Sequence, residues 1–191
     1  MRPFVFSCDA HIVEPNDLFT ANMSDACKQW APNAVIDDKN MRLNRLGETV
    51  LFKLPANFHA HKVGEANDLD IRRKGARDLK LRFADMERDG VDAELVFPSL
   101  GLLAPRIPDR TAAREAAQIY NDWAWEYLEG ARSKLVPAAI IPLVDLDDGL
   151  TELNRIIDMG YRAIMMPPVN VADTPKYNDP GASPARCPGY A

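Results

Sequence analysis

Asp9 and His11 are the residues of this chain whose types and spacing best suit chemistry. They follow the apolar stretch Phe4–Phe6, which predicts a short buried strand over residues 4–8. Because side chains alternate across a strand, residues two apart point to one side, so a carboxylate and an imidazole would leave the strand end together. These groups are ligand types that suit Zn²⁺ and related divalent ions. The alternative is structural: an aspartate in a turn and a histidine bonded to backbone.

Glu14 lies three residues beyond His11 and has three candidate roles. It is a further metal ligand, a partner that holds the tautomer of His11, or an acceptor for backbone N–H groups where a helix begins. The spacing alone leaves all three roles open.

Three more residues are candidates for contact with a substrate. His59 forms an H-x-H pair with His61 in a predicted loop, where two solvated side chains are the alternative. Ser99 follows the second predicted strand; it has no visible base partner, so a serine nucleophile is rejected. Arg162, near the fourth predicted strand, suits either a substrate carboxylate or a surface salt bridge.

The elements that would position these residues alternate between strand and helix. Strands are predicted over residues 4–8, 91–97, 135–143 and 161–166. Helices are predicted from Asn16 toward Trp30, through Leu79, Phe83 and Met86 to Gly90, from Asp109 or Thr111 to Gly130, and from Asp145 to Gly160 with Leu146, Leu150, Leu153 and Ile157 on the core side. Short β-type runs near residues 33–54 predict a small antiparallel insertion. The alternation predicts an α/β fold with a parallel sheet and right-handed crossovers.

The bulk properties limit the partners. The chain has 191 residues, a net charge of −5 and 47% hydrophobic residues, which suits one domain and argues against a nucleic-acid or anionic-membrane partner. The longest apolar run, residues 135–144, is too short to cross a bilayer. The three scattered cysteines form no disulfide framework, and the N-terminus shows no signal pattern, so a cytoplasmic location is predicted.

Several motifs in order resemble one family. They are Cys8-Asp9-Ala10-His11-Ile12-Val13-Glu14-Pro15, the stretch from Phe83 to Asp92, Tyr120-Asn121-Asp122-Trp123, Gly160-Tyr161-Arg162-Ala163-Ile164 and Tyr177-Asn178-Asp179-Pro180. Together they resemble the amidohydrolase-related proteins of the metal-dependent (β/α)₈ hydrolase superfamily, in the branch of aminocarboxymuconate-semialdehyde decarboxylase.

The resemblance implies an incomplete TIM-barrel-type fold of about four βα units over residues 1–180, followed by a tail over 181–191 whose composition predicts disorder. It also implies one divalent ion, Zn²⁺ or alternatively Mn²⁺, at Asp9 and His11. The family's further histidine and aspartate ligands, after its fifth and eighth strands, have no counterpart here. We therefore expect a truncated hydrolase or carboxy-lyase for a small carboxylic or aromatic acid that binds metal weakly and is inactive alone.

Two other functions remain open at this stage. One is a non-catalytic barrel remnant that forms homo-oligomers through open sheet edges. The other is an α/β module that binds a small molecule without chemistry.

Overall fold

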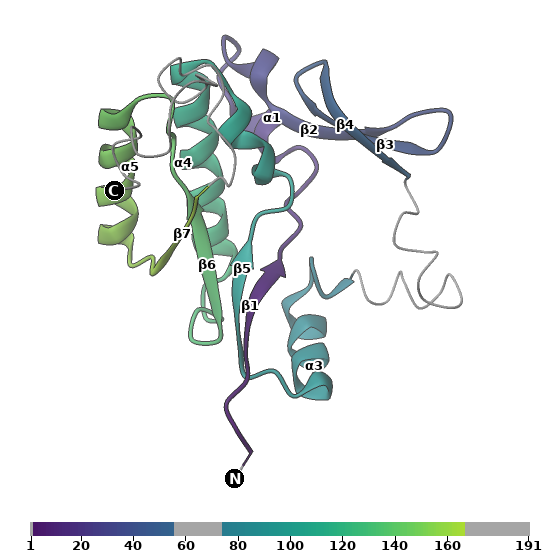
Figure 1. Cartoon of the computed structure of the whole chain (residues 1–191), viewed down its shortest axis with the longest axis vertical. Coiled ribbons are helices and arrows are strands. Elements are labelled where there is room, and N and C mark those ends of the chain that lie inside the picture. The colour runs from purple at the N-terminus through teal and green to yellow at the C-terminus, as the bar shows by residue number, and fades with distance from the viewer. Residues whose placement is uncertain (1, 56–73, 167–191) are drawn as a thin grey trace, which may run out of the picture.

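Four parallel strands form the framework of the molecule. The computed structural model describes residues 2–55 and 74–166, and Figure 1 shows the strands side by side with helices around them. The sheet order is β1-β5-β6-β7, and each neighbouring pair is parallel. The strands are β1 (Phe6–His11), β5 (Ala93–Phe97), β6 (Leu135–Ile140) and β7 (Ala163–Met165). This confirms the predicted α/β class.

Three of the helices described between these strands have an N-terminal cap made by an aspartate side chain. They are α3 (Leu79–Asp89), α4 (Arg110–Tyr127) and α5 (Leu146–Met159). The carboxylates of Asp78, Asp109 and Asp145 accept backbone N–H groups of the first turns. α3 and α5 end at Gly90 and Gly160, whose φ angles of 71° and 106° favour glycine. The predicted starts at Asp109 and Asp145 and the predicted ends at Gly90 and Gly160 are therefore correct, whereas α4 ends at Tyr127, before the predicted Gly130.

The predicted antiparallel insertion is present as a separate three-stranded sheet. Its order is β2-β3-β4, with β2 (Pro32–Ile36), β3 (Met41–Leu46) and β4 (Thr49–Pro55). The turn at Gly47 packs this sheet closely against the backbone of Gln29. Only a glycine fits there, because a Cβ at position 47 would lie 2.0 Å from the Gln29 carbonyl oxygen. The side chain of Asn33 also donates to the Ala31 and Gly47 carbonyls.

The first segments differ from the prediction. β1 begins at Phe6, and the phenyl side chains before and at its start are exposed rather than buried. The helix expected from Asn16 toward Trp30 is instead α1 (Leu18–Asn22) followed by a short 3₁₀ helix, η1 (Lys28–Trp30). The break comes between them at Ser24, whose N–H and hydroxyl both donate to Glu115 of α4. The loop after β5 likewise contains a 3₁₀ helix, η3 (Gly101–Arg106).

The buried face of α5 is also different from the predicted one. Leu146, Leu150 and Ile157 are largely exposed. Asp148, Gly149, Glu152 and Ile156 are buried in their place. The reason is that the buried acids have cationic or amide partners, because Asp148 binds Arg110 and Glu152 binds Asn121 and Arg155. Partnered charges therefore override the leucine periodicity here.

The main core lies between the parallel sheet and α4. The inner face of α4 is rich in alanine, which lets the helix approach the strands closely, and Tyr120 fills the remaining space. The described residues contain no helix long and apolar enough to cross a membrane.

Candidate functional site

Asp9 and His11 lie together at the carboxyl end of β1. The Nε2 atom of His11 is 3.6 Å from Oδ1 of Asp9, and the two side chains are 41% and 84% exposed. The pairing of β1 with β5 shows an irregularity between Ser7 and Ala10, next to this pair. Such bulges re-aim side chains and are common beside active sites. The structure therefore presents a carboxylate and an imidazole to solvent on the same side of the strand.

The ring of His11 has a fixed partner on its other nitrogen. Nδ1 lies 2.7 Å from the carbonyl oxygen of Pro98, directly after β5. A carbonyl oxygen only accepts, so Nδ1 carries the proton in this contact. In the neutral ring the lone pair then belongs to Nε2, the atom that faces Asp9. This is the tautomer that a metal-binding histidine needs at Nε2.

The backbone of His11 is held from the helix side. Arg82 of α3 donates to the carbonyl oxygen of His11 (2.8 Å) and to the carboxylate of Glu94 on β5 (2.6 Å). Both charged side chains are largely buried, at 8% and 13% exposure. Sequence reasoning missed Arg82, although its spacing from Leu79 and Met86 places it on the buried stripe of α3.

Glu14 makes contacts that match the third of its candidate roles, at the start of the 3₁₀ helix η3 rather than of a helix that follows Glu14 itself. The residue is 1% exposed, and its carboxylate accepts the backbone N–H groups of three consecutive residues: Ser99, Leu100 and Gly101. Burial raises its pKa, and these N–H donors oppose the shift. The neighbouring Tyr120 hydroxyl is buried, and its pKa is raised well above the usual value, first by burial and then by the charge of Glu14.

The remaining predicted site residues fall in different places. Ser99 lies in the turn after β5, at the same edge of the sheet as His11, and its N–H is bound by Glu14. Arg162 is exposed and precedes β7, so the structure puts it at the opposite edge, because all four strands are parallel. His59 lies outside the residues that the structure describes.

The ligand count at this edge stays at two. Within residues 2–55 and 74–166, no group of three or more His, Cys, Asp or Glu side chains comes together as a metal site. Catalytic zinc usually takes three protein ligands. Asp9 and His11 can therefore supply part of such a site, and at least one more ligand would have to come from elsewhere.

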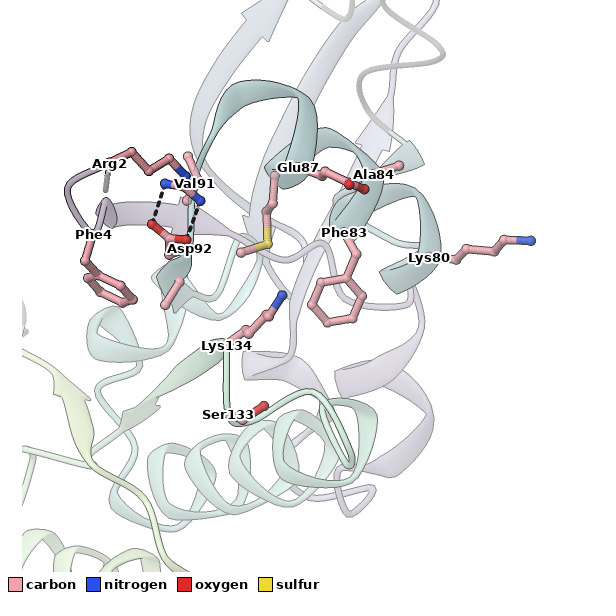
Figure 2. A pocket seen from close by; sticks show the side chains of 12 residues that line it. Arg2, Phe4, Lys80, Phe83, Ala84, Glu87, Val91, Asp92, Ser133 and Lys134 are labelled. Carbon is pink, nitrogen blue, oxygen red and sulfur yellow. Dashed lines mark hydrogen bonds and ion pairs between the residues drawn. The ribbon is translucent and has the colours of Figure 1, made fainter.

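Two cavities flank α3. The smaller, about 220 Å³, is bordered by His11, Arg82 and Glu94. The larger, about 830 Å³, opens near the amino ends of β5 and β6, away from Asp9. Figure 2 shows the amino group of Lys134 in the larger cavity between the ring of Phe83 and the Arg2–Asp92 ion pair. Neither cavity includes the Asp9 side chain among its walls.

The comparisons with known proteins find similar solved structures. No family model matches the chain, and no curated protein matches it. An amidohydrolase from Mycobacterium avium subsp. paratuberculosis K-10 matches with a TM-score of 0.68 at 16% identity, over 90% of this chain and 50% of that protein. A 2,6-dihydroxybenzoate decarboxylase from Rhizobium reaches a TM-score of 0.45 at 18% identity, over 85% and 38% of the two chains. A 2,6-dihydroxybenzoate decarboxylase complexed with 2,6-dihydroxybenzoate gives 0.45 at 18%, over 86% and 38%.

The likeness at this level of identity concerns the fold. The chain spans about half the length of the amidohydrolase it matches. The parallel βα units and the small antiparallel sheet agree with the architecture that the sequence motifs led us to expect. Over its described residues, the chain therefore has the fold of part of a TIM-barrel amidohydrolase.

Proposed function

We propose that this chain is part of a metal-dependent enzyme of the amidohydrolase type, with Asp9 and His11 as two of its metal ligands. The observation that carries the proposal is the pair itself: an exposed carboxylate oxygen and an exposed imidazole Nε2 lie 3.6 Å apart at the carboxyl end of a parallel strand. The carboxyl ends of the strands are the edge at which TIM-barrel enzymes keep their active sites.

The donor set fits a divalent ion. Bonds from Zn²⁺ to imidazole nitrogen and to carboxylate oxygen are each about 2 Å long, so atoms 3.6 Å apart are close enough to share one ion. His11 offers a lone pair on Nε2 because Nδ1 is bound to Pro98, and Asp9 adds a negative charge. Zn²⁺ is our first candidate and Mn²⁺ our second. When bound, such an ion lowers the pKa of water or polarises a carbonyl group.

The substrate class that we propose is a small carboxylic or aromatic acid, which would be hydrolysed or decarboxylated. The sequence motifs that resemble the decarboxylase branch support this class, and the match to an amidohydrolase supports the fold that would hold such a site. Ser99 lies at the correct edge to contact such a substrate, and His59 keeps its predicted role. Arg162 is a poor candidate, because it lies at the opposite edge. We also propose a cytoplasmic location, which is consistent with the free thiols of Cys8 and Cys27.

Metal binding is the direct test of this function. Titration calorimetry with Zn²⁺ should show binding to the wild-type chain. His11→Ala and Asp9→Asn should each weaken it at least about tenfold, because loss of even an outer partner of a metal ligand costs about 10–100-fold. Asp17→Asn is the matched control for Asp9, since Asp17 is exposed and its side chain makes no cap hydrogen bond. Equal affinity in all four proteins would overturn the proposal.

Catalytic activity should require a metal site with all of its ligands. With only two ligands in the described residues, we expect little or no turnover of dihydroxybenzoates by the Zn²⁺-loaded chain alone. Near-normal decarboxylation by the chain alone would contradict the two-ligand account.

A second candidate, self-association, is favoured by a separate observation. Phe4, Val5 and Phe6 are 73%, 41% and 46% exposed, on or beside the outer strand β1. An exposed apolar strand edge tends to pair with another chain. We propose that a second copy of this chain covers that edge.

A further inference from the structure

One turn connects the buried carboxylate of Glu14 to the ring of His11. The turn consists of residues 98–101, directly after β5. Glu14 accepts the N–H of Ser99 at 3.2 Å to each carboxylate oxygen, the N–H of Leu100 at 2.9 Å and the N–H of Gly101 at 2.8 Å. His11 donates from Nδ1 to the carbonyl oxygen of Pro98 at 2.7 Å. Both side chains therefore bind the same short segment.

The two contacts share a single peptide plane. The carbonyl of Pro98 and the N–H of Ser99 belong to one peptide group, which is planar. Among the described residues no peptide bond is cis, so these two groups point in opposite directions. When Glu14 holds the N–H on one side, it fixes the direction of the C=O on the other side. That carbonyl is the acceptor that sets the proton position and the orientation of the imidazole.

We propose that Glu14 is a positioning residue, which orients His11 for metal binding through the Pro98–Ser99 peptide plane. This inference rests on the proposed function, because it assigns Nε2 of His11 to a metal. Glu14 itself contacts the turn and not the ion. It acts together with Arg82, which fixes the backbone of His11 while the turn fixes its ring.

The chemistry of the turn explains why a carboxylate stands at this position. Three N–H donors converge on Glu14, and a carboxylate is an acceptor at both oxygens. A glutamine would direct its own NH₂ group toward one or more of these donors. Gly101 permits the close approach, because a Cβ there would lie 3.2 Å from Oε1 of Glu14 and 2.8 Å from Cδ1 of Ile140. A carboxylate is costly to bury, so stability alone is a weak reason to place one here.

The test reads the tautomer of His11 in the metal-free protein. The ¹⁵N shifts of the imidazole, assigned by their loss in His11→Ala, should show the Nδ1–H form in the wild type above neutral pH. In Glu14→Gln the population should move toward the Nε2–H form, and the Zn²⁺ affinity should fall about 10–100-fold. Glu115→Gln is the matched control, because Glu115 also accepts a backbone N–H, that of Ser24, without touching the turn. It should keep both wild-type values.

The outcomes distinguish the positioning role of Glu14 from the proposed metal-binding function. A folded Glu14→Gln variant with wild-type His11 shifts overturns the positioning role, even if its unfolding free energy is lower. If Glu14→Gln changes the tautomer but the wild type binds no Zn²⁺, the proposed function fails while the positioning role stands. If Glu14→Gln does not fold, Gly101→Ala replaces it, since it keeps the carboxylate and crowds its contact with the turn. Unchanged His11 shifts in folded Gly101→Ala would then overturn the inference.

Discussion

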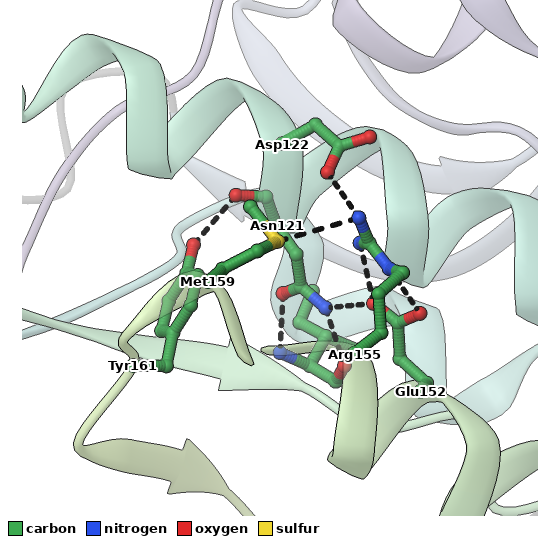
Figure 3. A network of polar contacts seen from close by, with 7 residues as sticks. Asn121, Asp122, Glu152, Arg155, Met159 and Tyr161 are labelled. Carbon is green, nitrogen blue, oxygen red and sulfur yellow. Dashed lines mark hydrogen bonds and ion pairs between the residues drawn. The ribbon is translucent and has the colours of Figure 1, made fainter. Parts of the chain in front are cut away.

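At the scale of single residues, Asn121 joins several buried polar groups. Its side chain accepts the N–H of Ile140 at 2.8 Å and donates to the carbonyl of the same residue at 2.9 Å, so it acts like a neighbouring strand at the end of β6. The side chain also donates to Glu152 at 2.7 Å, and the backbone carbonyl of Asn121 accepts the hydroxyl of Tyr161. Figure 3 shows how these contacts join the buried faces of α4 and α5 to the sheet, with Arg155 bound to Glu152.

Replacement of Asn121 should therefore lower the free energy of unfolding. Asn121→Ala leaves the buried groups of Ile140 and Glu152 without these partners, and we expect a loss of about 3 kcal/mol in unfolding free energy. Asn154→Ala, at an exposed position of α5, should change it by less than about 0.5 kcal/mol. Urea denaturation measures both. Equal effects of the two substitutions would show that the network does not stabilise the fold.

At the scale of elements, ion pairs connect the helices to one another and to the sheet. Arg110, the first residue of α4, forms two hydrogen bonds to Asp148 in the first turn of α5, at 2.6 and 3.0 Å. These hydrogen bonds hold the pKa of Asp148 below its usual value, although burial opposes the shift. In the first βα unit, Arg82 joins α3 to Glu94 of β5.

The Asp148 contact predicts a pH dependence of stability. Because the folded pKa is lower than the unfolded one, the contribution is present above the unfolded pKa, about 4, and is lost as the pH falls through the folded pKa. Asp148→Asn should thus be less stable than the wild type at pH 7, and the difference should shrink below about pH 4. Thermal unfolding followed from pH 7 to pH 3 measures this. Asp38→Asn, an exposed turn substitution, controls for the loss of a carboxylate. A difference that stays constant with pH would count against the ion pair.

The Arg82 contact predicts a different loss. Arg82→Met leaves Glu94 partly buried without its cation, which should cost about 3–5 kcal/mol of unfolding free energy. Arg88→Met, on the same helix, removes an exposed cation with two acidic neighbours and should cost less than about 1 kcal/mol. Guanidinium unfolding distinguishes them. Similar small losses for both variants would mean that Arg82 does not fix α3 against the sheet.

At the scale of the whole molecule, β1 is an outer strand of the parallel sheet, as far as the structure describes it, and also carries the candidate site. Phe6 is 46% exposed on this strand. We expect the wild type to self-associate as its concentration rises, and Phe6→Lys to weaken the association, because a charge blocks edge pairing. Phe52→Lys, on the separate β2-β3-β4 sheet at 44% exposure, is the matched control. Sedimentation velocity measures the masses, and a wild type that stays monomeric at all concentrations would contradict the prediction.

The sequence predicts the framework well because its signals are local. An aspartate before α4 and α5, a glycine after α3 and α5, and short apolar runs for strands need no knowledge of distant residues. The spacing of Asp9 and His11 likewise predicts that they point to one side.

The errors come from long-range partners. The buried face of α5 depends on Asn121 and Arg110, more than 25 residues away from the acids they bind. The break after α1 depends on Glu115 of α4. The roles of Glu14 and Arg82 appear only when β1, α3 and the turn after β5 are assembled. Helix and strand periodicity contains no information about such contacts.

Anomalous diffraction from crystals grown with Zn²⁺ tests the central claim most directly. Our account predicts a zinc peak within bonding distance, about 2 Å, of both Nε2 of His11 and a carboxylate oxygen of Asp9. The peak should vanish in crystals of His11→Ala. Zinc bound elsewhere, with the Asp9–His11 pair left without a peak, would contradict the account.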